Sequence, residues 1–134
     1  MSAVLYAAST GADTDWVVTL SDVYENGDSI RLSNYIVRAK YRHGLEQPQL
    51  LVPGQVEKYD IFLQNIAHTF AEGHRIRVTV TSSSKFVSFP NTNTGNDPYE
   101  DTEAIIVQQT IYHDHSYPSH IKLPVIPNAQ DHNT

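Results

Sequence analysis

Serine, histidine and aspartate side chains occur close together near the carboxyl end of the sequence, a combination that could support nucleophilic catalysis. Ser116 and Ser119 lie beside His120, and Asp114 precedes them. A catalytic triad, however, needs an oriented base and an oxyanion hole. None of the six glycines brackets a serine in the Gly-x-Ser-x-Gly spacing of an α/β-hydrolase nucleophile. Polar residues before a strand more often form a turn, so we predict no catalytic residue in this chain.

Three of the seven histidines are candidates for a zinc site. His113 and His115 would lie on one side of an extended chain, with His120 nearby. Zinc ligands usually also need supporting carboxylates and an ordered scaffold. The alternative, which we prefer, is a group of exposed loop histidines. Among the others, which show no cluster, His68 and His74 flank a predicted turn, and this favours a structural role.

Carboxylates gather at two other places. Asp13 and Asp15 stand beside Trp16 at a strand entrance, where a pair could do acid–base chemistry, although such aspartates more often satisfy backbone amides in a turn. A second group could offer oxygen ligands to calcium, but its spacing does not match an EF-hand loop and a charge run is usually solvated. Its members are Asp97, Glu100, Asp101 and Glu103. We predict no metal ion and no cofactor.

Aromatic side chains offer a further kind of site, because flat rings bind the C–H faces of sugars. The chain has eight tyrosines and one tryptophan. Tyr35, Tyr41 and Tyr59, however, fall on faces that we assign to the core. Phe86 and Phe89 lie in a loop rich in Asn and Thr, where two large rings could anchor a partner surface or be buried under the loop.

The bulk composition limits the class of protein. A chain of 134 residues with 40% hydrophobic residues predicts one globular domain. The net charge of −6 argues against binding to nucleic acid or to an anionic membrane. The absence of cysteine excludes a disulfide scaffold and thiolate metal sites. Because the sequence starts directly on a predicted strand, we expect it to be a segment of a longer protein.

The elements that must position these side chains are short β-strands. Apolar residues alternate on both sides of Asn26-Gly27, and this predicts a hairpin over 13–41 with a type I′ turn. Its apolar faces comprise Trp16, Val18, Leu20 and Tyr24, then Ile30 and Leu32, then Tyr35, Val37, Ala39 and Tyr41. Further strands are predicted over 2–8, 56–63, 74–82, 104–112 and 120–125. Short strands with turn signals and no long amphipathic helix indicate a β-sandwich or barrel.

Four segments, taken in order, resemble a known family. They are GADTDWVVTLSDVYENG at 11–27; LS at 32–33 with IVRAKYR at 36–42; AHTFAEGHRIRV at 67–78, continuing into SSSKF and PNTNTG; and QTIYHD at 109–114 with PSHIKLPV at 118–125. Together they are similar to the C-terminal, non-catalytic domain of the X-Pro dipeptidyl-peptidase and cocaine-esterase family of serine hydrolases. The α-amino-acid ester hydrolases and glutaryl-cephalosporin acylases of that family are the most similar. The similarity runs from about residue 3 to 127.

This resemblance implies an all-β, jelly-roll β-sandwich with a galactose-binding-like topology over residues 1–127, followed by a polar tail at 128–134. It also implies strands before Ala3 that this chain lacks. In the family, an α/β-hydrolase domain upstream carries the Ser, Asp and His triad, and no residue here matches it. The implied role is an accessory domain that packs on this catalytic domain, shapes its active-site surroundings and contributes to a homo-oligomer. The alternative is a stand-alone carbohydrate-binding module.

Overall fold

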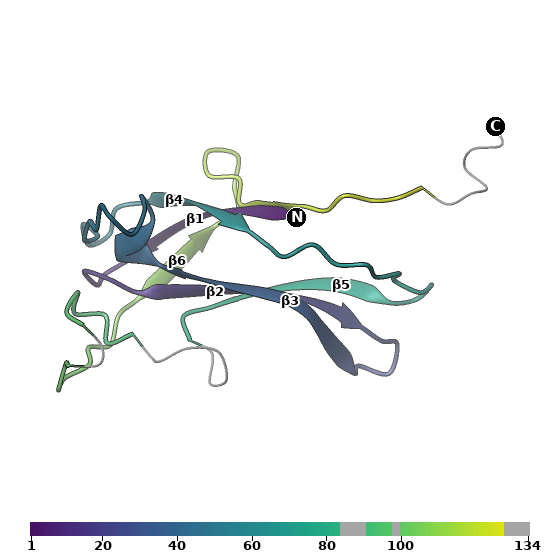
Figure 1. Cartoon of the computed structure of the whole chain (residues 1–134), viewed down its shortest axis with the longest axis horizontal. Helices are drawn as coiled ribbons and strands as arrows, with labels where there is room; N and C mark the ends of the chain where they lie inside the picture. The colour runs from purple at the N-terminus through teal and green to yellow at the C-terminus, as the bar shows by residue number, and fades with distance from the viewer. Residues whose placement is uncertain (84–90, 98–99, 128–134) are drawn as a thin grey trace.

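The chain folds into a sandwich of two antiparallel sheets (Figure 1). The computed structural model describes residues 1–83, 91–97 and 100–127. The elements are β1 (Ser2–Ser9), β2 (Asp15–Val23), β3 (Ser29–Arg38), the 3-10 turn η1 (Ala39–Tyr41), β4 (Glu57–Phe62), β5 (Arg75–Thr81), β6 (Gln109–Tyr112) and β7 (His120–Lys122). Sheet A has the order β4-β1-β6, with β7 also pairing with β1, and sheet B has the order β3-β2-β5. The predicted all-β sandwich is confirmed.

The core lies between the two sheets and follows the period-two pattern of the sequence. Tyr59 and Ile61 of β4, and Leu63 directly after it, are buried on the inner side as predicted, in one cluster with Trp16 and Val18 of β2. The rings of Trp16 and Tyr59 pack at 6.1 Å between centroids with a tilt of 60°. Each such side chain contributes about 2 kcal/mol by leaving water, so this cluster is the main force that holds the sheets together.

The β2–β3 hairpin is present, but its turn differs from the predicted type I′. A type I′ turn needs positive φ at both central residues. Gly27 has φ +92°, whereas Asn26 is not among the described residues with positive φ. The amide of Gly27 donates to the Tyr24 carbonyl at 3.0 Å, and the amide of Tyr24 donates to the Asp28 carbonyl at 2.7 Å. The hairpin therefore closes through the three-residue loop Glu25-Asn26-Gly27, in which only the glycine occupies the left-handed region.

A β-bulge in β3 changes which side chains reach each face of sheet B. Leu20 pairs with Ser33, but Ser21 pairs with Arg31, so Leu32 is the extra residue. Ile30 consequently stands opposite Asp22 on the inner face, and Arg31 stands beside Ser21 on the outer face.

Two tyrosines predicted to lie in the core are not buried there. Tyr35 is 45% exposed, because it lies on the edge strand β3 beyond the cover of sheet A. The alternation predicted to continue to Tyr41 ends at Arg38, where the chain turns into η1, and Tyr41 is only partly buried.

The strands β6 and β7 share one edge of β1. Tyr112 of β6 pairs with Tyr6, and His120 of β7 pairs with Val4. Residues 113–119 leave the sheet between them, and the Ser119 hydroxyl accepts the Tyr6 amide at 2.9 Å where the ladder is interrupted. The two strands are thus shorter than the predicted 104–112 and 120–125.

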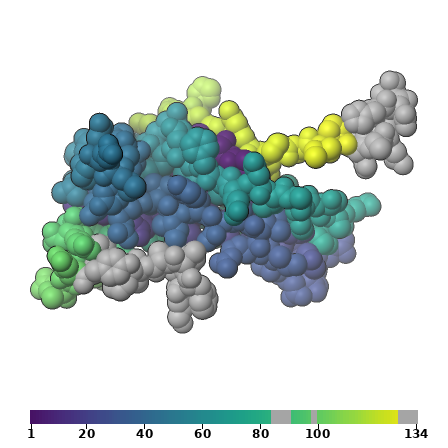
Figure 2. All heavy atoms as spheres, viewed as in Figure 1, coloured from purple at the N-terminus to yellow at the C-terminus, as the bar shows by residue number. Residues whose placement is uncertain are grey.

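Beyond β7 the described chain runs away from the body (Figure 2), and both Val125 and Ile126 are almost fully exposed. Over the residues that the structure describes, no helix is long and apolar enough to cross a membrane.

Candidate functional site

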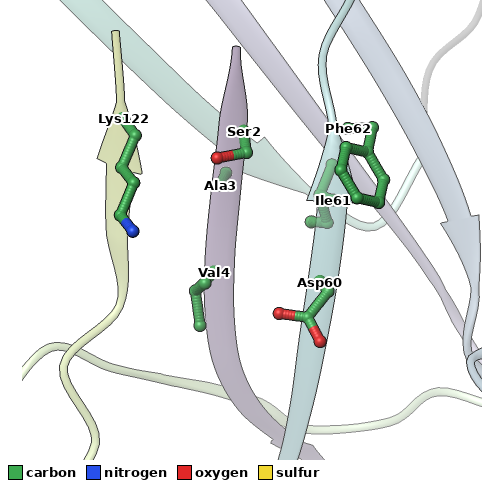
Figure 3. A pocket seen from close by; sticks show the side chains of 7 residues that line it. All are labelled: Ser2, Ala3, Val4, Asp60, Ile61, Phe62 and Lys122. Carbon is green, nitrogen blue, oxygen red and sulfur yellow. The ribbon is translucent and has the colours of Figure 1, made fainter.

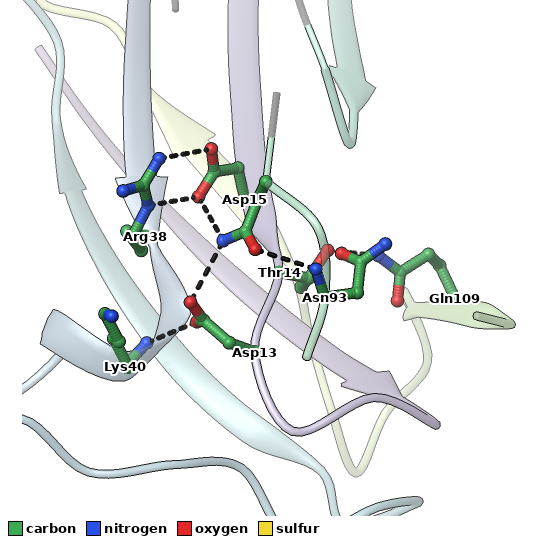
Figure 4. Close-up of polar contacts among 8 residues, drawn as sticks. Asp13, Thr14, Asp15, Arg38, Lys40, Asn93 and Gln109 are labelled. Atoms are coloured by element: carbon green, nitrogen blue, oxygen red, sulfur yellow. Dashed lines mark hydrogen bonds and ion pairs between the residues drawn. The ribbon is translucent and has the colours of Figure 1, made fainter. Parts of the chain in front are cut away.

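The carboxylate pair predicted from the sequence lies buried where the chain enters β2 (Figure 4). One oxygen of Asp13 accepts the backbone amide of Lys40 at 2.9 Å, and the other accepts the side-chain amide of Asn91 at 3.0 Å. Asn91 also donates to Asp15 at 2.9 Å. The Arg38 guanidinium completes the group with bonds of 3.0 and 3.2 Å to the two oxygens of Asp15.

This arrangement is suited to holding strands rather than to moving protons. Each oxygen of both carboxylates accepts a hydrogen bond, and both side chains are shielded from solvent. Hydrogen bonding to Asp15 raises the pKa of the Arg38 guanidinium, which therefore stays charged. The pair joins the β2 entrance to β3, η1 and the segment around Asn91. The predicted role of an aspartate as an acceptor of backbone amides applies to Asp13.

A polar link beside this pair joins β6 to the residue before β2 and to the residue after β5. The Gln109 side-chain amide donates to the Thr14 hydroxyl at 2.7 Å and to the Ser82 hydroxyl at 3.0 Å. The amide of Asn93, a residue with φ +66°, donates to the Asn91 side-chain oxygen at 2.9 Å (Figure 4). Residues distant in the sequence are therefore brought to one end of the sandwich.

A second buried carboxylate, Asp22, lies near the other end of β2. Its two oxygens contact the rings of His68 (Nε2, 2.7 Å) and His74 (Nδ1, 2.9 Å). The Tyr24 ring stacks on His74 with centroids 4.3 Å apart. Burial alone would raise the pKa of Asp22, but the hydrogen bonds and the electrostatic attraction from His68 and His74 outweigh it and hold this pKa below 3.8.

The prediction that His68 and His74 belong to no cluster is wrong, because both rings contact Asp22. They were assigned a structural role, and their contacts with Asp22 are of that kind, since they fasten the irregular segment between β4 and β5 to β2. A signal for this site was available. Asp22 continues the inward alternation of Trp16, Val18 and Leu20, and a carboxylate on an inner face requires partners.

The serine, histidine and aspartate near the carboxyl end each have a separate bonding partner. Ser119 accepts the Tyr6 amide, as described above, and His120 Nδ1 lies 2.7 Å from the Pro118 carbonyl. Asp114 accepts the Tyr117 amide at 2.7 Å, which closes a turn in the 113–119 excursion. These contacts are those of a turn between two strands.

The candidate metal ligands are spread over the surface. His113, His115 and His120 are exposed, and within the described ranges no three His, Asp or Glu side chains converge as a metal-binding group. Asp101 of the acidic stretch instead accepts the hydroxyls of Thr92 (2.8 Å) and Thr94. The bonds from Thr94 and Thr92 lower the pKa of this carboxyl. Phe86 and Phe89 lie outside the described residues.

The sandwich is open along the side where β5 faces β6 and β7. A groove of about 250 Å³ lies there, lined by inner-face residues of both sheets. They include Val18, Val78, Val80, Ile111 and Ile121. Although their side chains point toward the other sheet, Val78 and Ile111 are 40% and 39% exposed, and Ile76 farther along β5 is 52% exposed.

The outer face of sheet A carries a second pocket, of about 350 Å³ (Figure 3). Phe62, which is 74% exposed, stands at its rim with Asp60, and Lys122 lies on the far side of β1. The tyrosine rings on this sheet pack on one another instead, with Tyr117 at 5.8 Å from Tyr6 and 5.1 Å from Tyr112.

Comparison with known proteins places these features in a family context. A protein-family model, the X-Pro dipeptidyl-peptidase C-terminal non-catalytic domain, matches residues 1–122. The cocaine esterase of Rhodococcus sp. (strain MB1 Bresler) is 36% identical over 129 residues, which cover 94% of this chain and 22% of that protein.

Two solved structures share the fold. An aminopeptidase from a marine sediment archaeon, Thaumarchaeota archaeon, has a TM-score of 0.79 and 32% identity over 88% of this chain and 21% of its own. An α-amino acid ester hydrolase has a TM-score of 0.83 and 30% identity, again over 88% of this chain and 21% of its own. This chain therefore spans about one fifth of the length of these relatives.

Proposed function

This chain belongs to the family of X-Pro dipeptidyl-peptidase C-terminal non-catalytic domains, and on that basis we propose that it serves as the accessory domain of a serine hydrolase. The parent enzyme would be of the dipeptidyl-peptidase, esterase or acyl-ester hydrolase type. Its nucleophile, base and acid would reside in an α/β-hydrolase domain. The role of the present domain would be to pack on that domain, shape the surroundings of its active site and support its assembly.

The open side of the sandwich is the observation that carries the packing proposal. Ile76, Val78 and Ile111 point toward the interior yet remain exposed. Exposed inner-face apolar residues beside a groove are the kind of surface that a neighbouring domain would cover, and this supports the packing proposal. The hydrolase domain of the same parent is the occupant we propose, because relatives about five times longer contain this domain as one fifth of their length.

A sugar-binding function is the second candidate, and the exposed ring of Phe62 is what favours it. Phe62 stands beside Asp60, so an apolar ring and a hydrogen-bonding group adjoin one pocket (Figure 3). The tyrosines of the same face offer less, because their rings are occupied by one another. A glycan array would test this candidate, and loss of a positive signal in Phe62→Ala would locate the site.

The non-catalytic role is tested by assaying the purified chain. We expect no hydrolysis of nitrophenyl esters or of X-Pro nitroanilides. Turnover that persists in the double variant Ser116→Ala/Ser119→Ala would contradict the proposal, because it would require a nucleophile that we have not identified.

The packing role is tested by calorimetric titration of the chain with the separately expressed α/β-hydrolase domain of its parent. The double variant Ile76→Ser/Val78→Ser should weaken binding at least tenfold, since it removes two apolar side chains from the proposed contact. The matched control is Ile106→Ser, which changes a fully exposed isoleucine away from the groove. Equal effects of the two variants would exclude the groove as the contact surface.

A further inference from the structure

Three arginines lie together on the outer face of sheet B, on the side opposite the buried core. Arg31 and Arg77 flank Ser21 in the same row across the sheet, and Arg75 flanks Val23 in the next row. All three are exposed. We call this surface the arginine face. In Figure 1 no drawn segment covers the hairpin end of this layer.

The bulge in β3 is what completes this face. If the register that holds up to the Leu20–Ser33 pair continued, Arg31 would lie opposite Asp22, on the inner face. The extra residue Leu32 turns Arg31 to the outer face, beside Ser21. Three of the five arginines of the chain thereby gather on one side.

The guanidinium groups of the arginine face are not paired with carboxylates within the described part of the chain. None of its three guanidinium groups forms a hydrogen bond or an ion pair there, whereas Arg38 and Arg42 are paired with Asp15 and Glu57. Arg31 and Arg77 stand two strand spacings apart, about 10 Å, and Arg75 lies about 7 Å from Arg77. These backbone separations are comparable with the screening length of about 8 Å at physiological salt, so repulsion among the three charges is weak there and stronger at lower salt.

Ser21 and Val23 are both buried although they point outward on this face. The aliphatic stems of the neighbouring arginines can cover them while the charged heads remain in water. The exposed part of this face is therefore formed by the arginines, a residue type enriched in protein contact surfaces.

We propose that the arginine face is a docking surface for an acidic protein surface. Carboxylates would offset the repulsion among the three guanidinium groups and could accept two hydrogen bonds from each. A second copy of this chain is a poor occupant, because a twofold contact through this face would bring six arginines together. Nucleic acid is disfavoured by the net charge of −6 of the chain as a whole.

Poly-L-glutamate is the probe for this proposal, with binding measured by calorimetry on the full chain. We expect binding that weakens about tenfold between about 50 and about 200 mM salt. The double variant Arg31→Gln/Arg77→Gln should abolish it. The control Lys58→Gln/Lys122→Gln removes the same two positive charges from sheet A and should leave binding within about twofold of wild type.

The melting temperature separates docking from a structural role. Since the arginines repel one another, Arg31→Gln/Arg77→Gln should melt at the same temperature as wild type or higher. Absence of poly-L-glutamate binding at low salt, or equal loss in the lysine control, would overturn the proposal. Tighter binding to a 20-base-pair DNA duplex than to poly-L-glutamate would also overturn it, in favour of a nucleic-acid partner.

Discussion

The two ends of β2 are both held by buried aspartates, but with different chemistry. At the entrance, Asp15 is joined to the guanidinium of Arg38, and Asn91 bridges Asp15 and Asp13. Near the exit, Asp22 is joined to the imidazoles of His68 and His74. The guanidinium is a permanent cation, whereas an imidazole can donate to a carboxylate without carrying charge. One strand thus has a permanent ion pair at one end, which we call the ion-pair anchor, and carboxylate–imidazole contacts at the other, which we call the hydrogen-bond anchor.

The two anchors also differ in what they hold. The ion-pair anchor joins β2 to β3 and to η1, which are elements of regular structure. The hydrogen-bond anchor fastens residues 63–74, which have no regular structure, over the inner face of sheet B. We therefore expect loss of the first to destabilise the whole sandwich, and loss of the second to release one segment.

The largest effect is expected at the ion-pair anchor. Asp15→Ala leaves Arg38 and the Asn91 amide without their shared acceptor and should lower the free energy of unfolding by about 3 kcal/mol. This loss of about 3 kcal/mol is at the lower end of the range for breaking a buried ion pair, because the Arg38 side chain is 24% exposed. Urea unfolding monitored by Trp16 fluorescence measures it. A loss below that of Asp22→Ala would break the comparison.

A smaller loss is expected for Asp22→Ala at the hydrogen-bond anchor. The side chains of His68 and His74 are 25% and 19% exposed, so water can replace the missing carboxylate. Hydrogen exchange should show that the effect of Asp22→Ala is local rather than global, with faster amide exchange confined to residues 63–74. Faster exchange across both sheets would mean that this anchor, too, supports the global fold.

The acid dependence of stability should single out Asp22. Its pKa in the folded chain lies below the 3.8 expected when unfolded, so its contribution is present above that pH and is lost as the pH falls through the folded value. The difference in unfolding free energy between wild type and Asp22→Asn should therefore shrink as the pH falls below 3.8. Asp60→Asn, at an exposed carboxylate, controls for the change in net charge. A constant difference across this range would contradict the assignment.

The smallest effects are expected at two glycines near the Asp22 end. Gly27 and Gly73 have φ of +92° and +84°, so an alanine at either costs about 1 kcal/mol in backbone strain. A side chain on Gly27 would contact nothing, whereas one on Gly73 would have to displace the Glu25 carboxylate. Gly73→Ala should therefore be the more destabilising of the two in thermal unfolding. Equal losses would show that Glu25 moves away freely.

The sequence predicted β1 to β5 well but made β6 and β7 too long, and the successes come from half-buried strands, whose apolar residues recur with a period of two. Tyr59, Ile61 and Leu63 were placed correctly by this rule, and so was the hairpin. The turn type was not, because Asn-Gly fits both a two-residue loop and a three-residue loop with glycine last. The bulge was visible in retrospect as a change of phase, since Ile30 and Leu32 are even-numbered whereas Tyr35 and Val37 are odd-numbered.

The polar partners were harder to predict than the strands. Asn91 lies 76 residues from Asp15 along the chain, and a contact across such a distance leaves no local pattern. His68 lies in a segment without regular structure, where periodicity says nothing about direction. The sequence could predict that an aspartate on an inner face requires a hydrogen-bond donor, but not which residue donates.

The interruption between β6 and β7 has an evolutionary consequence. The excursion at 113–119 leaves and rejoins the same edge of β1, and the Ser119 hydroxyl closes the gap that it leaves. Insertions or deletions at its tip would not shift the register on either side, and lengthening such a loop costs little entropy. Homologous enzymes could therefore vary the size of this excursion freely, and it is a natural place to graft a tag or a new recognition loop.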